Sequence, residues 1–236
     1  MRRDVGRGLA LAALVALTGC AGVSEPRAMW RFAEGDTAGE RRVQGPCGER
    51  YPAEVGLRID MIRQQLEQGR PRSALAHLQQ ADFGRAESVL MRGDALRAIG
   101  RRDEADAVYE TLATGCLAAD AYQGMARNAA ARGDRREAIL LMREARHARP
   151  TDPGIRNDLG YLLLLEGHRR QAREELLTAL ELGDVGQRAA SNLVVLLMQE
   201  GRSAEAERLA DRYGVDAALV ERLRGLARAQ GRDGEG

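Results

Sequence analysis

The stretch that decides the fold is residues 153–186, PGIRNDLGYLLLLEGHRRQAREELLTALELGDVG. Its apolar residues recur at helical spacing on both sides of Gly167, with Leu159 and Leu163 before it and Leu176 and Ala179 after it. A glycine in this position ends a helix, because it adopts a left-handed backbone at low cost. The stretch therefore predicts two amphipathic helices joined by a tight turn at Gly167.

The same pattern recurs along most of the chain at intervals of about 34 residues. The turn glycine recurs at Gly69, Gly100, Gly133, Gly167, Gly201 and Gly231. An alanine stands five residues after each of the first five, at Ala74, Ala105, Ala138, Ala172 and Ala206. One helix pair cannot bury both of its apolar faces, so successive pairs must stack. The sequence therefore predicts an all-α array over residues 55–231.

This period, with its Leu-Gly and Ala positions, resembles the tetratricopeptide repeat (TPR), most closely at Leu159-Gly160, Gly167, Ala172 and Ala179. The resemblance implies a TPR superhelix of about five repeats followed by a C-terminal capping helix. The expected repeats are 55–85, 86–118, 119–152, 153–186 and 187–216, with the capping helix at 217–231 and a disordered tail at 232–236. TPR arrays bind unrelated partners, so the fold implies protein binding without naming the partner.

The N-terminus has the pattern of a lipoprotein signal. Arg2, Arg3 and Arg7 precede a short apolar run that ends in Leu17-Thr18-Gly19-Cys20. This ending is similar to the bacterial lipobox, which implies cleavage after residue 19 and acylation of Cys20. The resemblance places the protein in the outer membrane, anchored by its lipid, with the repeat array facing the periplasm.

Residues 20–54 are rich in Arg, Glu and Gly, contain Pro26, Pro46 and Pro52, and show no sustained apolar period. They are predicted to be a flexible tether. Two cysteines remain besides Cys20, namely Cys47 in the tether and Cys116 between two repeats. In an oxidising periplasm they can pair, or they can remain two separate thiols.

Composition and motifs argue against catalysis and nucleic-acid binding. The formal net charge is +1, too small for binding to nucleic acid by bulk electrostatics. The three histidines have no metal-ligand spacing, and no nucleophile motif or phosphate-binding loop is present. Asp103-Glu104 and Glu174-Glu175 are predicted to lie on solvated helix faces. We therefore expect no enzyme activity, no catalytic residue, no metal, no cofactor and no small-molecule substrate.

In TPR arrays the first helix of each repeat lines the binding groove. The corresponding positions in the C-terminal half form a mostly apolar set with polar residues among them, which suits an amphipathic partner helix. The predicted partner-binding residues are Arg127, Asn157, Tyr161, Leu164, Asn192, Val195 and Met198. The sequence contains no Lys, so it lacks the lysines of the TPR clamps that hold a C-terminal carboxylate.

The lipobox, the tether and about five TPRs together resemble the TadD-type lipoproteins of tight-adherence (Flp) pilus systems. The phrases Asn157-Asp158-Leu159-Gly160-Tyr161 and Ser191-Asn192-Leu193 are similar to that group. The resemblance implies a pilotin-like role, in which the protein binds a secretin subunit and assists its assembly in the outer membrane. The alternative is a general periplasmic scaffold for outer-membrane assembly or for peptidoglycan enzymes.

Overall fold

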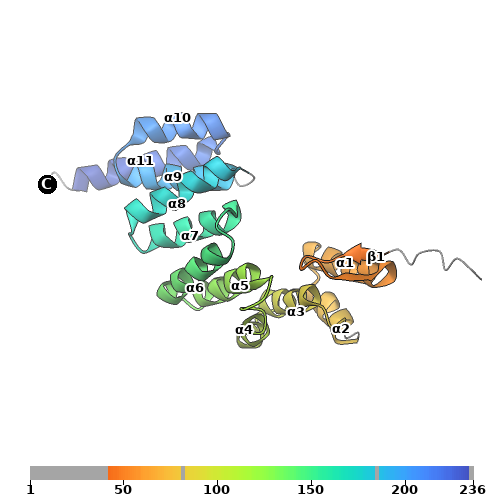
Figure 1. Cartoon of the computed structure of the whole chain (residues 1–236). Helices are drawn as coiled ribbons and strands as arrows, with labels where there is room; N and C mark the ends of the chain where they lie inside the picture. The colour runs from red at the N-terminus through yellow and green to blue at the C-terminus, as the bar shows by residue number, and fades with distance from the viewer. Residues whose placement is uncertain (1–41, 81–82, 184–185, 234–236) are drawn as a thin grey trace, which may run out of the picture. The chain divides into compact units, whose positions relative to one another are not determined.

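The computed structural model describes residues 42–80, 83–183 and 186–233, with only the backbone described from residue 226 onward. The predicted signal peptide and Cys20, the predicted site of acylation, lie outside these residues. The described chain is all-α apart from one short hairpin, and its helices follow one another in pairs (Figure 1). The first helices of the pairs are α1 (Ala53–Glu67), α3 (Ala86–Ala98), α5 (Ala118–Ala131), α7 (Pro153–Leu165) and α9 (Gly186–Gln199). The second helices are α2 (Pro71–Gln80), α4 (Arg102–Glu110), α6 (Arg135–Ala148), α8 (Arg169–Leu182) and α10 (Ser203–Tyr213).

A last helix, α11 (Ala217–Asp233), packs against α9 and α10, where a sixth pair would otherwise begin. Asp216 caps it, since its carboxylate accepts a hydrogen bond of 2.7 Å from the Ala218 N–H. The helix extends two residues beyond the expected capping helix, into the segment expected to be a disordered tail.

Each helix pair turns at the predicted glycine. Gly69, Gly100, Gly133, Gly167 and Gly201 all have positive φ, between 69° and 87°. The residue after each glycine donates its N–H to a carbonyl five residues back, as His168 does to Leu163 at 2.9 Å. This Schellman pattern satisfies carbonyls that the helix end leaves without partners, and it gives all five turns the same geometry.

The core is a row of adjoining clusters. Ile59, Ile62, Ala74 and Leu78 belong to the first cluster, while Leu75, Ala95 and Tyr109 belong to the second. Leu66 packs on both of these clusters, and Tyr122 and Leu141 pack on both the second cluster and the large C-terminal one. The array is therefore stabilised between neighbouring pairs, as expected for a repeat protein.

The expected tether differs from the structure in residues 42–54. Strands β1 (Arg42–Gln44) and β2 (Arg50–Pro52) pair antiparallel, with Val43 opposite Tyr51, and α1 begins directly after them at Ala53. Tyr51 is only 4% exposed, in one cluster with Ile59 and Ile62 of α1. Burial of this ring explains why the segment is ordered although its strands are too short to show a sequence period.

Candidate protein-binding face

A hollow of about 260 Å³ lies between α5, α6 and α7, on the face where the partner site is predicted. Its lining residues are Ala126, Arg127, Ala130, Met142, Asp158, Tyr161 and Leu162. The small side chains of Ala126 and Ala130 leave the space open, and Met142 and Leu162 supply an apolar floor. Tyr161 remains 45% exposed at its edge. The hollow has the volume of one or two large side chains, so it suits an apolar anchor from another chain.

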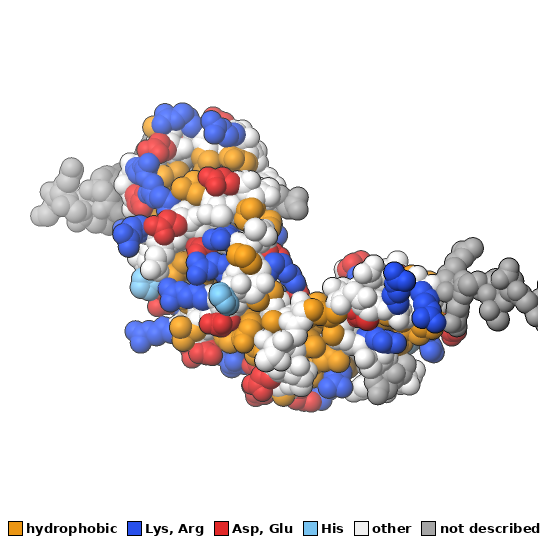
Figure 2. Space-filling view, in the orientation of Figure 1, with side chains coloured by type: hydrophobic (Ala, Val, Ile, Leu, Met, Phe, Trp, Pro, Cys, Tyr) orange, Lys and Arg blue, Asp and Glu red, His pale blue; other side chains and the backbone are white. Residues whose placement is uncertain are grey.

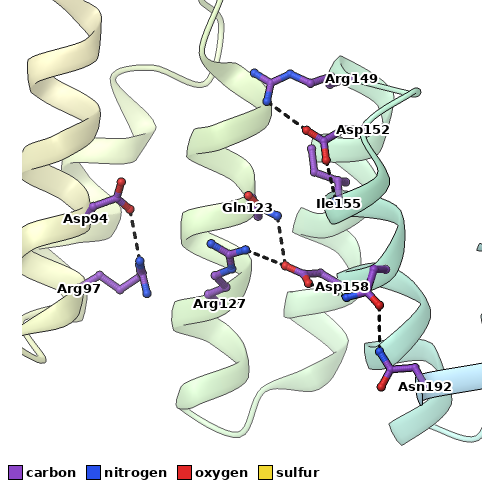
Figure 3. Close-up of polar contacts among 10 residues, drawn as sticks. Asp94, Arg97, Gln123, Arg127, Arg149, Asp152, Ile155, Asp158 and Asn192 are labelled. Carbon is purple, nitrogen blue, oxygen red and sulfur yellow. Dashed lines mark hydrogen bonds and ion pairs between the residues drawn. The ribbon is translucent and has the colours of Figure 1, made fainter. Parts of the chain in front are cut away.

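The rim of the hollow is held by polar contacts between first helices (Figure 3). Asp158 of α7 accepts hydrogen bonds from Gln123 at 3.1 Å and from Arg127 at 2.8 Å, both on α5. Asn157 donates to Asp158 at 3.2 Å, and its own amide oxygen accepts a bond of 2.9 Å from Asn192 of α9. This chain of contacts joins α5, α7 and α9 and fixes the position of Asp158 and Arg127 beside Tyr161.

The seven predicted binding residues divide into two groups. Arg127 and Tyr161 line the hollow, and Asn192 and Val195 are partly exposed on α9. Asn157, Leu164 and Met198 are only 4%, 8% and 3% exposed, so the prediction that they face a partner is wrong for their side chains. A first helix in a stack touches neighbours on both sides, and these three positions turn into that packing.

The N-terminal hairpin contacts the first helices of the first two repeats. The Tyr51 hydroxyl of the hairpin donates a hydrogen bond of 3.2 Å to Glu87 on α3, and Arg85 lies 5.5 Å from the centre of the Tyr51 ring. Glu87 also pairs with Arg63 of α1. These contacts place the hairpin against α1 and the start of α3.

Cys47 and Cys116 are joined by a disulfide, with their Cα atoms 5.6 Å apart. Cys47 lies in the turn of the hairpin and Cys116 in the connection between α4 and α5, and both residues are exposed. The bond ties the hairpin to the start of the third repeat. The hairpin itself was missed in the sequence, although Gly45-Pro46-Cys47-Gly48 is a turn signal between Val43 and Tyr51.

The prediction that both glutamates of the acidic pair on α8 are solvated is wrong for Glu175. Glu174 is exposed, but Glu175 is only 6% exposed and lies between Arg146 at 2.5 Å and Arg156 at 2.7 Å. A buried carboxylate needs such partners to offset its lost hydration. The group therefore links α6, α7 and α8 and has a structural role.

Within residues 42–80, 83–183 and 186–233, no group of three or more His, Cys, Asp or Glu side chains is arranged to hold a metal ion. In the same ranges, every helix is too short or too polar to cross a lipid bilayer. The described histidines lie apart, on α2, at the end of α6 and in the turn before α8.

Fold and site together define an all-α repeat scaffold of the kind that binds other proteins. No protein-family model matches the chain. The chain is 37% identical over 185 residues to the TPR repeat-containing protein PA4299 of Pseudomonas aeruginosa, a match that covers 78% of this chain and 75% of the relative. The chain belongs to the TPR repeat-containing proteins.

Solved structures support the fold at low sequence identity. TTC0263, a thermophilic TPR protein of Thermus thermophilus, matches with a TM-score of 0.53 and 20% identity, over 72% of this chain and 97% of that one. MamA 41-end from Desulfovibrio magneticus RS-1 matches with a TM-score of 0.52 and 16% identity, over 75% of this chain and 97% of that one. Both likenesses bear on the fold alone.

Proposed function

We propose that the protein is a non-catalytic lipoprotein of the outer membrane and acts as a pilotin of a tight-adherence pilus system. In this proposal it binds a secretin segment through the hollow between α5 and α7. The observation that carries the binding step is the hollow itself. It combines an apolar floor, an exposed Tyr161 and a charged rim held at Arg127 and Asp158. These are the features of a site that accepts one apolar anchor of an amphipathic helix.

The proposed location has two supports. The lipobox-like Leu17-Thr18-Gly19-Cys20 is the acylation signal. The exposed disulfide between Cys47 and Cys116 is of the kind that persists in an oxidising compartment such as the periplasm. Anchoring the protein and a membrane-bound partner in one leaflet raises their effective concentration, so a small hollow is sufficient for assembly.

The test uses the full chain with Cys20→Ser, purified without lipid, and measures its affinity for fragments of the secretin encoded nearest to its own gene. Tyr161→Ala should weaken binding at least tenfold, because it removes the exposed ring at the edge of the hollow. Leu177→Ala is the matched control, since Leu177 is 43% exposed but lies on α8, outside the hollow. Equal affinities of the two variants would refute the site.

The secretin assignment and the lipid anchor are tested separately. If no secretin fragment binds the wild-type chain, the pilotin role is wrong, and the general periplasmic scaffold becomes the better hypothesis. Mass spectrometry of the protein from membranes should show a processed, acylated Cys20. An N-terminus that retains residues 1–19 or carries no acyl group would contradict the anchor.

A further inference from the structure

A second hollow, of about 450 Å³, lies at α6 and the turn between α7 and α8. Its lining residues are Arg136, Ile139, Leu140, Arg143, Glu166 and His168. On α6, Leu140 is two positions from Met142, the floor of the first hollow, which places the two side chains about 200° apart around the helix. The second hollow therefore opens on another face of the array, and its role does not rest on the proposed secretin site.

This face carries positive charge that the described chain does not neutralise. Arg136, Arg169 and Arg170 are exposed, and none of them has a carboxylate within ion-pair distance among the described residues. Arg143 donates only to the neutral side chain of Gln171, at 3.3 Å. Figure 2 shows basic side chains gathered over the middle of the array, around α6 to α8.

The acidic residues nearby do not form ion pairs with these arginines among the described residues, although Glu137 follows Arg136 and Glu144 follows Arg143 in the sequence. Glu166, the one acid that lines the second hollow, is already paired with Arg135 at 3.6 Å. Some arginines of the described array have acidic partners, as Arg149 has Asp120 at 2.6 Å and Arg132 has Asp106 at 2.8 Å, and others have none. Arg136 and Arg143 belong to the second group and line a hollow, so an incoming carboxylate would find guanidinium groups there without a competing acidic partner.

Apolar surface lies among these charges. Leu140 is 55% exposed, and Ile139 beneath it is 6% exposed. An exposed leucine beside unpaired arginines suits a ligand that carries both carboxylates and an apolar side chain. A peptide segment has this chemistry and can enter a hollow. An anionic lipid surface is broad, so it would contact a protruding or flat basic face, and the carboxylate of Glu166 in the lining would repel it.

We propose that the hollow formed by Arg136, Leu140, Arg143 and His168 is a second docking site, which takes an acidic segment of a protein partner. Carboxylates of the segment pair with Arg136 and Arg143, and one apolar side chain covers Leu140. A scaffold with docking sites on two faces can hold two chains at the same time.

The experiment uses the full chain with Cys20→Ser and a fluorescent synthetic 12-residue peptide built from Glu and Leu in alternation. A second peptide with Lys in place of each Glu tests the sign of the charge. We expect saturable binding of the acidic peptide below about 1 mM, weakened as salt is raised from 50 to 200 mM, and no binding of the basic peptide. Absence of saturable binding of the acidic peptide would overturn the proposal.

Two matched double variants locate the site. Arg136→Glu with Arg143→Glu should weaken peptide binding at least tenfold, and Leu140→Ala severalfold. Arg208→Glu with Arg212→Glu makes the same charge change at exposed positions of α10 and should leave binding close to wild type. Equal losses in both double variants would show a net-charge effect and refute the site. Circular dichroism melting of each variant shows whether it is folded. If Arg136→Glu with Arg143→Glu is not folded, the single variants Arg136→Gln and Arg143→Gln take its place.

Lipid vesicles test whether the second hollow binds an anionic lipid surface instead of a peptide. The same chain is mixed with neutral vesicles and with vesicles that contain anionic phosphatidylglycerol. If Arg136→Glu with Arg143→Glu abolishes vesicle binding while the peptide never binds, the surface recognises lipid and the proposal is wrong. Peptide binding that the same variant abolishes supports the proposal, whatever the vesicles do.

Discussion

Gly160 of α7 lies against Leu176 of α8, so close that a Cβ atom at residue 160 would stand 2.7 Å from the Leu176 Cγ. The two helices of the fourth repeat approach each other at this point, and only glycine leaves room for the leucine, which is fully buried. The Leu-Gly position of the repeat is thus a packing requirement between two helices.

Gly160→Ala should lower the free energy of unfolding by about 1–2 kcal/mol, because overpacking costs more than the gain in helix propensity. Gly225→Ala on α11 is the control, since a Cβ atom there meets nothing within 4 Å. Urea denaturation of both variants measures the difference. A Gly160→Ala variant as stable as wild type would show that Leu176 can move aside.

Tyr109 makes a related contact in the second repeat. Its ring is fully buried against Gly93 and Gly124, and its hydroxyl donates a hydrogen bond of 2.8 Å to Asp94. Tyr109→Phe should cost about 1 kcal/mol, since the ring still fills the space between the glycines while the hydrogen bond is lost. Chemical denaturation at neutral pH measures this loss.

Alkaline pH gives an independent test of Tyr109. Burial, together with the nearby Asp94 carboxylate, raises the pKa of Tyr109 above its ordinary value. The neutral hydroxyl is favoured in the folded state, so its contribution to stability is complete below about pH 10 and is lost as pH rises toward the higher folded-state pKa. Above pH 10, wild type should therefore lose more stability than Tyr109→Phe. The comparison uses the Cys20→Ser background, so that no free thiol attacks the disulfide. Parallel losses would contradict the assignment.

Glu175→Gln should destabilise the protein by about 2 kcal/mol, because it leaves Arg146 and Arg156 without their shared buried carboxylate. Glu174→Gln is the matched control at the next position, where the side chain is exposed and the expected change is within about 0.5 kcal/mol. Thermal and urea unfolding of the two variants measure the change in the free energy of unfolding. Equal effects would mean that the arginine pair is adequately solvated without Glu175.

Loss of the disulfide should both destabilise the array and loosen the hairpin. Cys47 and Cys116 are separated by 69 residues, and closing a loop of this length stabilises a protein by about 4 kcal/mol in the chain-entropy description. Cys47→Ser with Cys116→Ser should approach that loss. Hydrogen exchange over residues 42–52 should accelerate in this variant and remain slow in Cys20→Ser. Unchanged exchange would mean that Tyr51 and Glu87 hold the hairpin without the bond.

Sequence periodicity is sufficient to predict the helix pairs, because each turn depends on a local requirement. Gly167 ends a helix through its own backbone, and the apolar positions around it follow from the helical period. The hairpin depends instead on distant contacts, from Tyr51 to Glu87 and from Cys47 to Cys116, which no local pattern carries.

The exposure of the predicted binding residues could be inferred from the sequence only in part, for a similar reason. A helical period identifies the side of α7 that carries Asn157, Tyr161 and Leu164, but a small rotation of the helix decides which of them remains outside. Packing against α6, α8 and α9 sets that rotation, and on the α9 side it includes the hydrogen bond from Asn192 to Asn157. Arg127 and Tyr161 therefore line the hollow, while Asn157 and Leu164 are buried in the stack.

The bond between Cys47 and Cys116 also determines how the molecule responds to mechanical force. Tension applied to the segment before Cys47 passes through the sulfur atoms to Cys116 and enters α5 directly. Residues 48–115, which include the first two helix pairs, lie in the loop that the disulfide closes and therefore outside the shortest covalent path of the force. A pull at the N-terminal end is thus delivered to the third repeat, the one whose first helix forms a wall of the hollow beside Tyr161.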